Sequence, residues 1–86
     1  MKIDYTKRFL KQYYKQPIKV QQQFQDRINI FKTNPLDPKL RNHPLKGKYS
    51  KYKSINITGD IRALYTENSD GKIVLFAFIG SHSQLY

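Results

Sequence analysis

The chain contains no cysteine among its 86 residues, and this absence excludes three classes of protein. A disulfide-stapled domain, a zinc site with thiolate ligands and an enzyme with a cysteine nucleophile all need that side chain. Acidic side chains are also few, because only six Asp and Glu are scattered singly along the chain. A catalytic two-metal site needs clustered carboxylates. We therefore expect neither a metal nor another cofactor.

Several sequence signatures are missing as well. The chain has no phosphate-binding loop, no glycine-rich dinucleotide fingerprint and no HExxH zinc motif. Its longest apolar run, residues 73–79, is far shorter than the ~20 residues that span a bilayer. The N-terminal residues lack the apolar segment of a signal peptide. We expect one soluble cytoplasmic domain over residues 1–86, without a membrane partner.

Positive charge dominates what is present. Sixteen Lys and Arg against six Asp and Glu give a formal net charge of +10. Residues 39–59 contain no acidic side chain and carry six basic ones: Lys39, Arg41, Lys46, Lys48, Lys51 and Lys53. Such a segment is either a solvated surface or a site for a polyanion or an acidic protein. His43, Tyr49 and Tyr52 lie in the same segment and favour RNA, because these rings stack on bases.

Helical periodicity is confined to the first 33 residues. Thr6 is a suitable N-cap for a first helix, and Pro17 suits the first position of a second helix. The second helix is expected to end near Thr33, because Asn34-Pro35 disfavours its continuation. The apolar stripes of the two helices are Phe9, Leu10, Tyr13 and Tyr14, and then Val20, Phe24, Ile28 and Phe31.

The remaining elements are expected to be strands. Alternation and turn signals predict strands at residues 2–5, 53–58, 61–66 and 72–79. Residues 39–50 are polar and are expected to form an ordered loop. The predicted fold is α+β in the order β-α-α-β-β-β: a small, mostly antiparallel sheet packed on a helical hairpin. In the strand at 53–58, Ser54 and Asn56 face away from the helices.

Residues capable of acid–base chemistry lie on or beyond that polar face. Candidates are Asn56, Asp60, Arg62, His82 and Tyr86, with His43 in the preceding loop. Two imidazoles supply a base and an acid near neutral pH, and an arginine stabilises a pentacoordinate phosphorane. Each also has an ordinary interpretation: solvated histidines, an Arg62–Asp60 pair, an Asp60 in a turn, and a terminal tyrosine. The predicted RNA contacts are Lys46, Lys48, Lys51, Lys53, Tyr49 and Asn56.

Three motifs in order resemble those of the RelE/YafQ family of bacterial toxins, from type II toxin–antitoxin modules. They are HPLKG at 43–47, GDIRALY at 59–65 and IGSHSQLY at 79–86, and the resemblance covers nearly the whole chain. It implies metal-independent cleavage of mRNA in the ribosomal A site, in which a ribose 2′-hydroxyl attacks the adjacent phosphate. It also implies a cognate antitoxin, which the net charge suggests is acidic, and binding to the ribosome.

The resemblance assigns roles to particular residues. His43, Asp60 and His82 would transfer or orient protons, Arg62 would stabilise the phosphate, and Tyr86 would be the terminal aromatic of the site. The chain departs from the pattern at Asn56, where the YafQ-type strand has a second histidine. Two alternatives remain at this stage: a ParE-like toxin that inhibits gyrase, and a basic RNA- or ribosome-binding module without catalysis.

Overall fold

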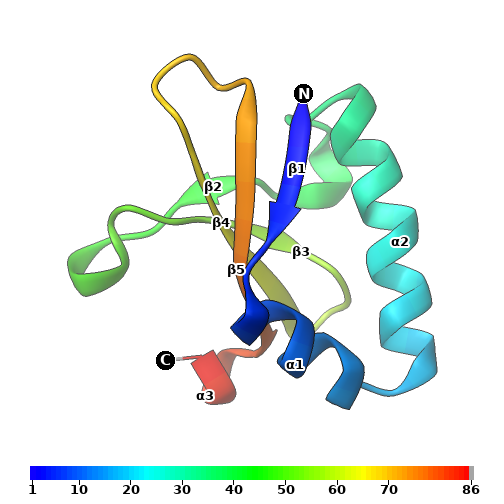
Figure 1. The fold of residues 1–86 in the computed structure, drawn as a ribbon. Helices are drawn as coiled ribbons and strands as arrows, with labels where there is room; N and C mark the ends of the chain where they lie inside the picture. The colour runs from blue at the N-terminus through cyan, green and yellow to red at the C-terminus, as the bar shows by residue number, and fades with distance from the viewer. Residues whose placement is uncertain (86) are drawn as a thin grey trace.

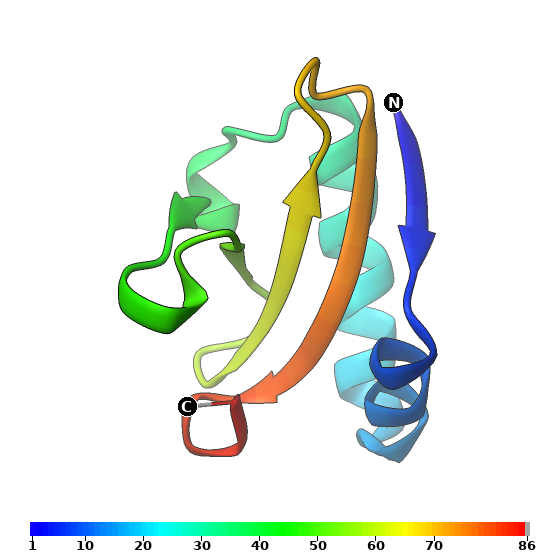
Figure 2. The same ribbon diagram turned by 60° about the vertical axis from the view of Figure 1, so that its left-hand side comes forward.

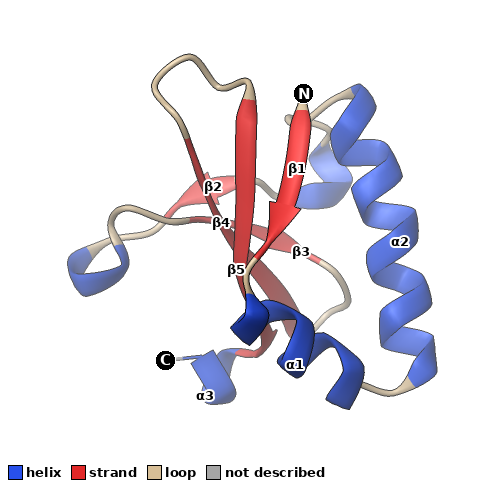
Figure 3. Ribbon diagram, viewed as in Figure 1, coloured by secondary structure: helices blue, strands red, loops and turns tan. Residues whose placement is uncertain are grey.

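The computed structural model describes residues 1–85 and contains a five-stranded sheet in the order β1-β5-β4-β3-β2 (Figure 1). The strands are β1 (Lys2–Tyr5), β2 (His43–Pro44), β3 (Lys53–Asn56), β4 (Ile61–Glu67) and β5 (Ile73–Ser81). The helices are α1 (Lys7–Lys15), α2 (Ile18–Thr33) and α3 (His82–Leu85), with 3₁₀ turns η1 (Pro38–Leu40) and η2 (Gly47–Tyr49) (Figure 3). The α+β fold is as predicted. No helix within residues 1–85 is long and apolar enough to cross a membrane.

The ends of the first two helices follow from local sequence. The Thr6 hydroxyl accepts a hydrogen bond from the backbone N–H of Phe9 at 3.0 Å and donates one to the carbonyl of Ala77 at 3.2 Å. It therefore caps α1 as predicted and also fastens the start of α1 to β5. Pro17 is the N-cap of α2 and not its first residue, so the helix begins at Ile18, one residue later than predicted. The helix ends at Thr33, as predicted.

Aromatic side chains fill the space between the helices and one face of the sheet. Phe9, Phe24, Phe31, Tyr65 and Phe76 are each at most 2% exposed. The centroids of neighbouring rings lie 5.2–5.8 Å apart and most pairs are tilted or edge-to-face, as in Phe31–Tyr65 and Phe24–Phe76. Such pairs contribute roughly 0.5–1.5 kcal/mol beyond the burial of their area. The helices α1 and α2 therefore cover this face of the sheet, and the other face is left to the connecting segments and α3.

Pairing within the sheet is mixed. β4 and β5 form the predicted antiparallel hairpin, but both strands run further than expected, to Glu67 and Ser81. β3 ends at Asn56, two residues earlier than predicted. β1 pairs in parallel with β5, which is distant in sequence. The register shifts at Leu64/Tyr65, where β5 contains one extra residue, so that β4 and β5 bend locally.

The basic segment is more ordered than a loop. The prediction of a loop at residues 39–50 was wrong in detail, because this range contains the end of η1 and the whole of β2 and η2. Leu40 is completely buried. The Asn42 amide accepts a hydrogen bond from the Tyr65 hydroxyl at 2.9 Å and donates one to the Pro35 carbonyl at 2.9 Å. The segment is thereby tied to the aromatic core before it turns out along the sheet as η2 (Figure 2).

The Tyr65–Asn42 hydrogen bond yields a prediction about stability. Tyr65→Phe is expected to lower the free energy of unfolding by about 1 kcal/mol at neutral pH, because Asn42 loses its donor. Burial raises the pKa of the Tyr65 hydroxyl. The folded state therefore holds the phenol proton more tightly than the unfolded chain, and this stabilisation is present below about pH 10 and lost as the pH rises further. Urea unfolding at pH 7 and at pH 10.5 measures both effects.

The wild-type chain is expected to lose more stability than Tyr65→Phe over this alkaline range. The difference in the free energy of unfolding between the two proteins therefore narrows. Tyr14→Phe is the matched control, since Tyr14 is 70% exposed and should behave as wild type. An equal alkaline loss in wild type and Tyr65→Phe would show that Tyr65 does not carry the effect.

Candidate active site

A cavity of about 430 Å³ lies beside the sheet face that the helices leave uncovered. Figure 1 shows η2 and α3 on one side of the sheet and α2 on the other. The cavity is lined by His43, Leu45, Lys46, Tyr49, Ser54, Arg62 and His82. Its walls therefore come from β2, from η2 and the two residues before it, and from β3, β4 and α3. Three of the predicted catalytic residues, His43, Arg62 and His82, line the cavity together with two of the predicted RNA contacts, Lys46 and Tyr49.

His43 lies in β2 at the exposed edge of the sheet. Its Nδ1 is 2.7 Å from the carbonyl oxygen of Arg41. A carbonyl only accepts hydrogen bonds, so Nδ1 carries the proton and the neutral ring has its free lone pair on Nε2. Arg41 has a φ of 47°, in the left-handed region that non-glycine residues rarely adopt. This bend at the end of η1 brings the Arg41 carbonyl to the histidine ring.

His82 enters the cavity from the opposite side, as the first residue of α3. The helix packs tightly on the end of β5: a Cβ placed on Gly80 would lie 3.3 Å from the Cβ of Gln84 and 3.4 Å from a methyl carbon of Leu85. The Tyr49 hydroxyl donates a hydrogen bond to the Leu85 carbonyl at 2.8 Å. This contact joins η2 to α3, so two walls of the cavity are held to each other.

Arg62 stands on β4 between these two walls. Its cross-strand partners are Asn56 on β3 and Gly80 on β5. One guanidinium N–H group donates to the Gly59 carbonyl at 3.4 Å, which leaves the other donors of the guanidinium for an anion. Asp60 lies exposed in the turn that precedes β4, does not line the cavity, and forms no ion pair with Arg62 within residues 1–85.

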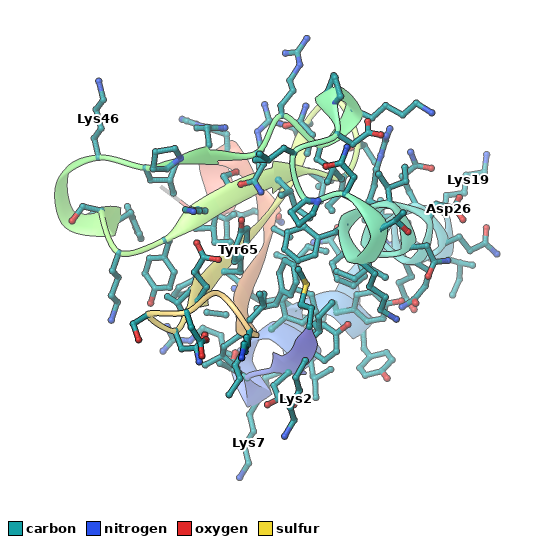
Figure 4. The ribbon with its side chains drawn as sticks, turned by 90° about the horizontal axis from the view of Figure 1, so that it is seen from above. Lys2, Lys7, Lys19, Asp26, Lys46 and Tyr65 are labelled. Atoms are coloured by element: carbon teal, nitrogen blue, oxygen red, sulfur yellow. The ribbon has the colours of Figure 1, made fainter. Side chains whose placement is uncertain are left out.

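The basic residues near η2 are placed differently from one another. Lys46 lines the cavity, and its side chain extends from the outer tip of the molecule (Figure 4). Lys48 and Lys51 do not line it. Their ammonium groups lie 5.4 Å and 5.3 Å from the ring centroids of Tyr49 and Tyr52, within the range of a cation–π contact. Lysines thus alternate with tyrosines along residues 46–52, and of these residues Lys46 and Tyr49 line the cavity.

Two further predicted residues, Lys53 and Asn56, lie outside the cavity lining. Lys53 is on the other face of β3, and its ammonium is 2.5 Å from a carboxylate oxygen of Glu67. This hydrogen bond raises the pKa of Lys53. Asn56 faces the same side as Arg62 but does not line the cavity. Tyr86 lies outside the described residues.

The character of the lining indicates which ligand fits. Among residues 1–85 it is lined by two imidazoles, a lysine and an arginine and by no carboxylate, so it favours an anion. A larger hollow of about 570 Å³ lies over α1, but it contains no histidine and is lined by Lys7, Arg8, Leu10, Lys11 and Tyr14. Within residues 1–85 no three His, Asp or Glu side chains gather as metal ligands. The cavity is therefore suited to proton transfer at a bound phosphate.

Sequence reasoning missed two residues of this lining, Leu45 and Ser54. Leu45 is apolar and gave no chemical signal. Ser54 did give one, because the alternation of β3 placed it on the polar face with Asn56. The signal was not used because a single serine in a strand has no motif around it.

The whole chain is similar to one known family of proteins. The model of a family described as bacterial toxin of type II toxin-antitoxin system, YafQ, matches residues 1–86. A comparison with curated proteins gives no match.

Solved structures of toxins share the fold. A copper-bound mutant toxin from Helicobacter pylori is 26% identical with a TM-score of 0.73, and the match covers 100% of this chain and 99% of that one. A YoeB/ParE toxin from Agrobacterium tumefaciens is 24% identical with a TM-score of 0.78, covering 95% and 99%. The E. coli DinJ-YafQ complex contains a chain that is 21% identical with a TM-score of 0.69, covering 98% and 96%.

Proposed function

The chain belongs to the YafQ family of toxins from bacterial type II toxin–antitoxin systems, and on this basis we propose that it is a metal-independent endoribonuclease that cleaves mRNA in the ribosomal A site. The observation that carries the proposal is the convergence of His43, Arg62 and His82 on one cavity with a basic lining. An RNA phosphodiester requires a base, an acid and a cationic group at one place, and this cavity contains all three. A substrate on the ribosome places the activity in the cytoplasm.

The proposed reaction is an internal transesterification. His43 accepts the proton of the ribose 2′-hydroxyl through Nε2, and the 2′-oxygen attacks the adjacent phosphorus. A pentacoordinate phosphorane forms, and Arg62 stabilises its additional negative charge. The bond to the 5′-oxygen then breaks, and His82 donates a proton to that leaving oxygen. The products are a 2′,3′-cyclic phosphate and a 5′-hydroxyl.

The assignment of His43 as the base rests on its tautomer. Its Nδ1 proton is engaged by the Arg41 carbonyl, so Nε2 of the neutral ring is the atom that accepts a proton. His82, across the cavity, then serves as the acid. Asp60 does not line the cavity, so we assign it a supporting role. It acts through the turn that contains Gly59, whose carbonyl accepts the hydrogen bond from Arg62. We retain Tyr86 as a stacking or proton-donating group.

Binding of RNA is assigned to the cavity rim. We propose Lys46, Lys48 and Lys51 as phosphate contacts and Tyr49 as an aromatic contact, since these residues surround η2 at the open side of the site. Asn56 supports Arg62 across the β3–β4 pair and cannot titrate, so the two histidines divide the proton transfers between them. Lys53 is left with a structural role because Glu67 neutralises it.

Regulation is assigned to an acidic antitoxin. A net charge of +10 with an anion-binding cavity suits a negatively charged partner. The E. coli YafQ toxin has been solved in complex with DinJ. We propose that the cognate antitoxin of this chain covers the cavity or displaces α3.

Removal of either histidine is the direct test of catalysis. His43→Ala and His82→Ala are each expected to lower the rate of mRNA cleavage by about 10²–10⁴-fold, because each removes one proton-transfer group. The measurement is cleavage of ribosome-bound mRNA by the purified protein, with mapping of the new 5′-hydroxyl ends.

Lys19→Ala serves as the control, because Lys19 is an exposed residue of α2 outside the cavity. Growth arrest by His82→Ala equal to that of wild type would contradict the catalytic proposal. Inhibited DNA supercoiling with intact mRNA would instead favour the ParE-like alternative.

The lysines give a second test, based on salt dependence. Each phosphate contact to single-stranded RNA contributes about 0.7 to the slope of log affinity against log salt concentration. Lys46→Ala is expected to reduce the slope by about that amount, whereas Lys53→Ala should leave it nearly unchanged because Glu67 already pairs with Lys53. Affinity for a short RNA is measured over a range of salt concentrations; equal effects of the two substitutions would refute the assignment.

The antitoxin proposal is tested by co-expression. The reading frame next to that of this chain is expected to encode a short acidic protein that co-purifies with it and restores growth. Hydrogen exchange of the complex should show protection at residues 43–54 or a displaced α3. An inactive complex in which both regions keep the exchange rates of the free toxin would overturn this mechanism.

A further inference from the structure

Among residues 1–85, Ser54 is the one buried residue with a polar side chain outside the aromatic rings. The side chain is 1% exposed, and its hydroxyl oxygen is buried without a hydrogen-bond partner among residues 1–85. All other buried side-chain oxygens and nitrogens in that part of the chain have partners. Buried polar groups are nearly always paired in folded proteins, and an unpaired buried hydroxyl destabilises the fold. Its presence therefore calls for a reason other than stability.

Its position supplies that reason. Ser54 lines the cavity, and its Cα partners across the sheet are His43 on β2 and Leu64 on β4. Paired residues point to the same side of a sheet, so Ser54 lies beside His43. Because His43 is exposed and Ser54 is not, His43 forms the rim of the cavity and Ser54 its floor.

The neighbouring groups determine what the hydroxyl would meet. Arg62 is two residues from Leu64, the partner of Ser54 on β4, and faces the same side. An anion drawn in by Arg62 and Lys46 brings acceptor oxygens to the floor of the cavity. A serine hydroxyl is a neutral donor that can rotate to meet such an oxygen. A hydrogen bond from a neutral donor to a charged oxygen is worth about 1.5–3 kcal/mol.

We propose that the Ser54 hydroxyl donates a hydrogen bond to a non-bridging oxygen of the RNA phosphate that enters the cavity, an inference that rests on the proposed function. Within residues 1–85 the hydroxyl is unpaired because its partner is the ligand. Ser54 is thus a binding residue that holds the phosphorus between His43 and Arg62. It transfers no proton.

The test exploits opposite effects on stability and on binding. Ser54→Ala is expected to leave the melting temperature unchanged or to raise it, because the variant no longer buries an unpaired hydroxyl. The same variant is expected to bind RNA about 10–100-fold more weakly, which corresponds to the lost hydrogen bond. The probe is a short RNA with 2′-O-methyl groups, which binds but cannot undergo 2′-oxygen attack, and its affinity is measured by fluorescence anisotropy.

Ser50→Ala is the matched control. Ser50 is exposed in the same basic segment and does not line the cavity, so both its melting temperature and its RNA affinity should equal those of wild type. Wild-type affinity in Ser54→Ala would overturn the inference. A weaker affinity accompanied by a lower melting temperature would also overturn it, because the loss would then reflect damage to the fold.

The binding assay separates this inference from the proposed catalysis. Tenfold weaker binding by Ser54→Ala with intact stability supports a phosphate contact, whether or not the wild-type chain cleaves mRNA. Failure of the wild-type chain to cleave ribosome-bound mRNA counts against the proposed enzyme activity alone. If wild type does cleave, the rate of Ser54→Ala on unmodified mRNA should fall by a similar 10–100-fold; an unchanged rate would contradict the contact.

Discussion

The cationic segment of residues 39–53 is held against the sheet by uncharged contacts, because its six basic side chains have no acidic neighbour within the segment. Within residues 1–85 only Lys53 of the six forms an ion pair. The segment is anchored instead by burial of Leu40, by the Tyr65–Asn42 hydrogen bond and by the pairing of β2 with β3. These contacts offset the repulsion between like charges and leave the charges available to an anion. The candidate site depends on this arrangement.

Much of the fold could be predicted from local sequence signals. The Thr6 cap, the end of α2 before Pro35 and the β4–β5 hairpin each depend on residues that are close together in the chain. The two-residue strand β2 could not be predicted, because its hydrogen bonds depend on β3, about ten residues away. The same holds for α3, a single turn that is stabilised by Leu85 and by the distant Tyr49. Elements that short have no periodicity of their own.

The candidate site was predicted in part, for a related reason. Alternation along β3 and β4 placed Ser54 and Arg62 on one face, and the structure joins Arg62 to the two histidines in one cavity. The alternation pattern could not reveal which basic residues are neutralised, since the partner of Lys53 lies on another strand. Nor could it show that the Ser54 hydroxyl lacks a partner, because that is a property of the packed interior. Residue types indicated the chemistry, but tertiary contacts decide which side chains remain available for it.

The parallel pairing of β1 with β5 has a consequence for the way the chain folds. The Thr6 hydroxyl reaches the Ala77 carbonyl, 71 positions along the chain, and all four residues of β1 pair only with β5. Non-local contacts of this kind require a large loop to close before they contribute any stability, which slows folding. During synthesis, the first strand has no partner until β5 has been made. The nascent protein is therefore expected to mature in one late cooperative step, without an early half that can fold or act alone.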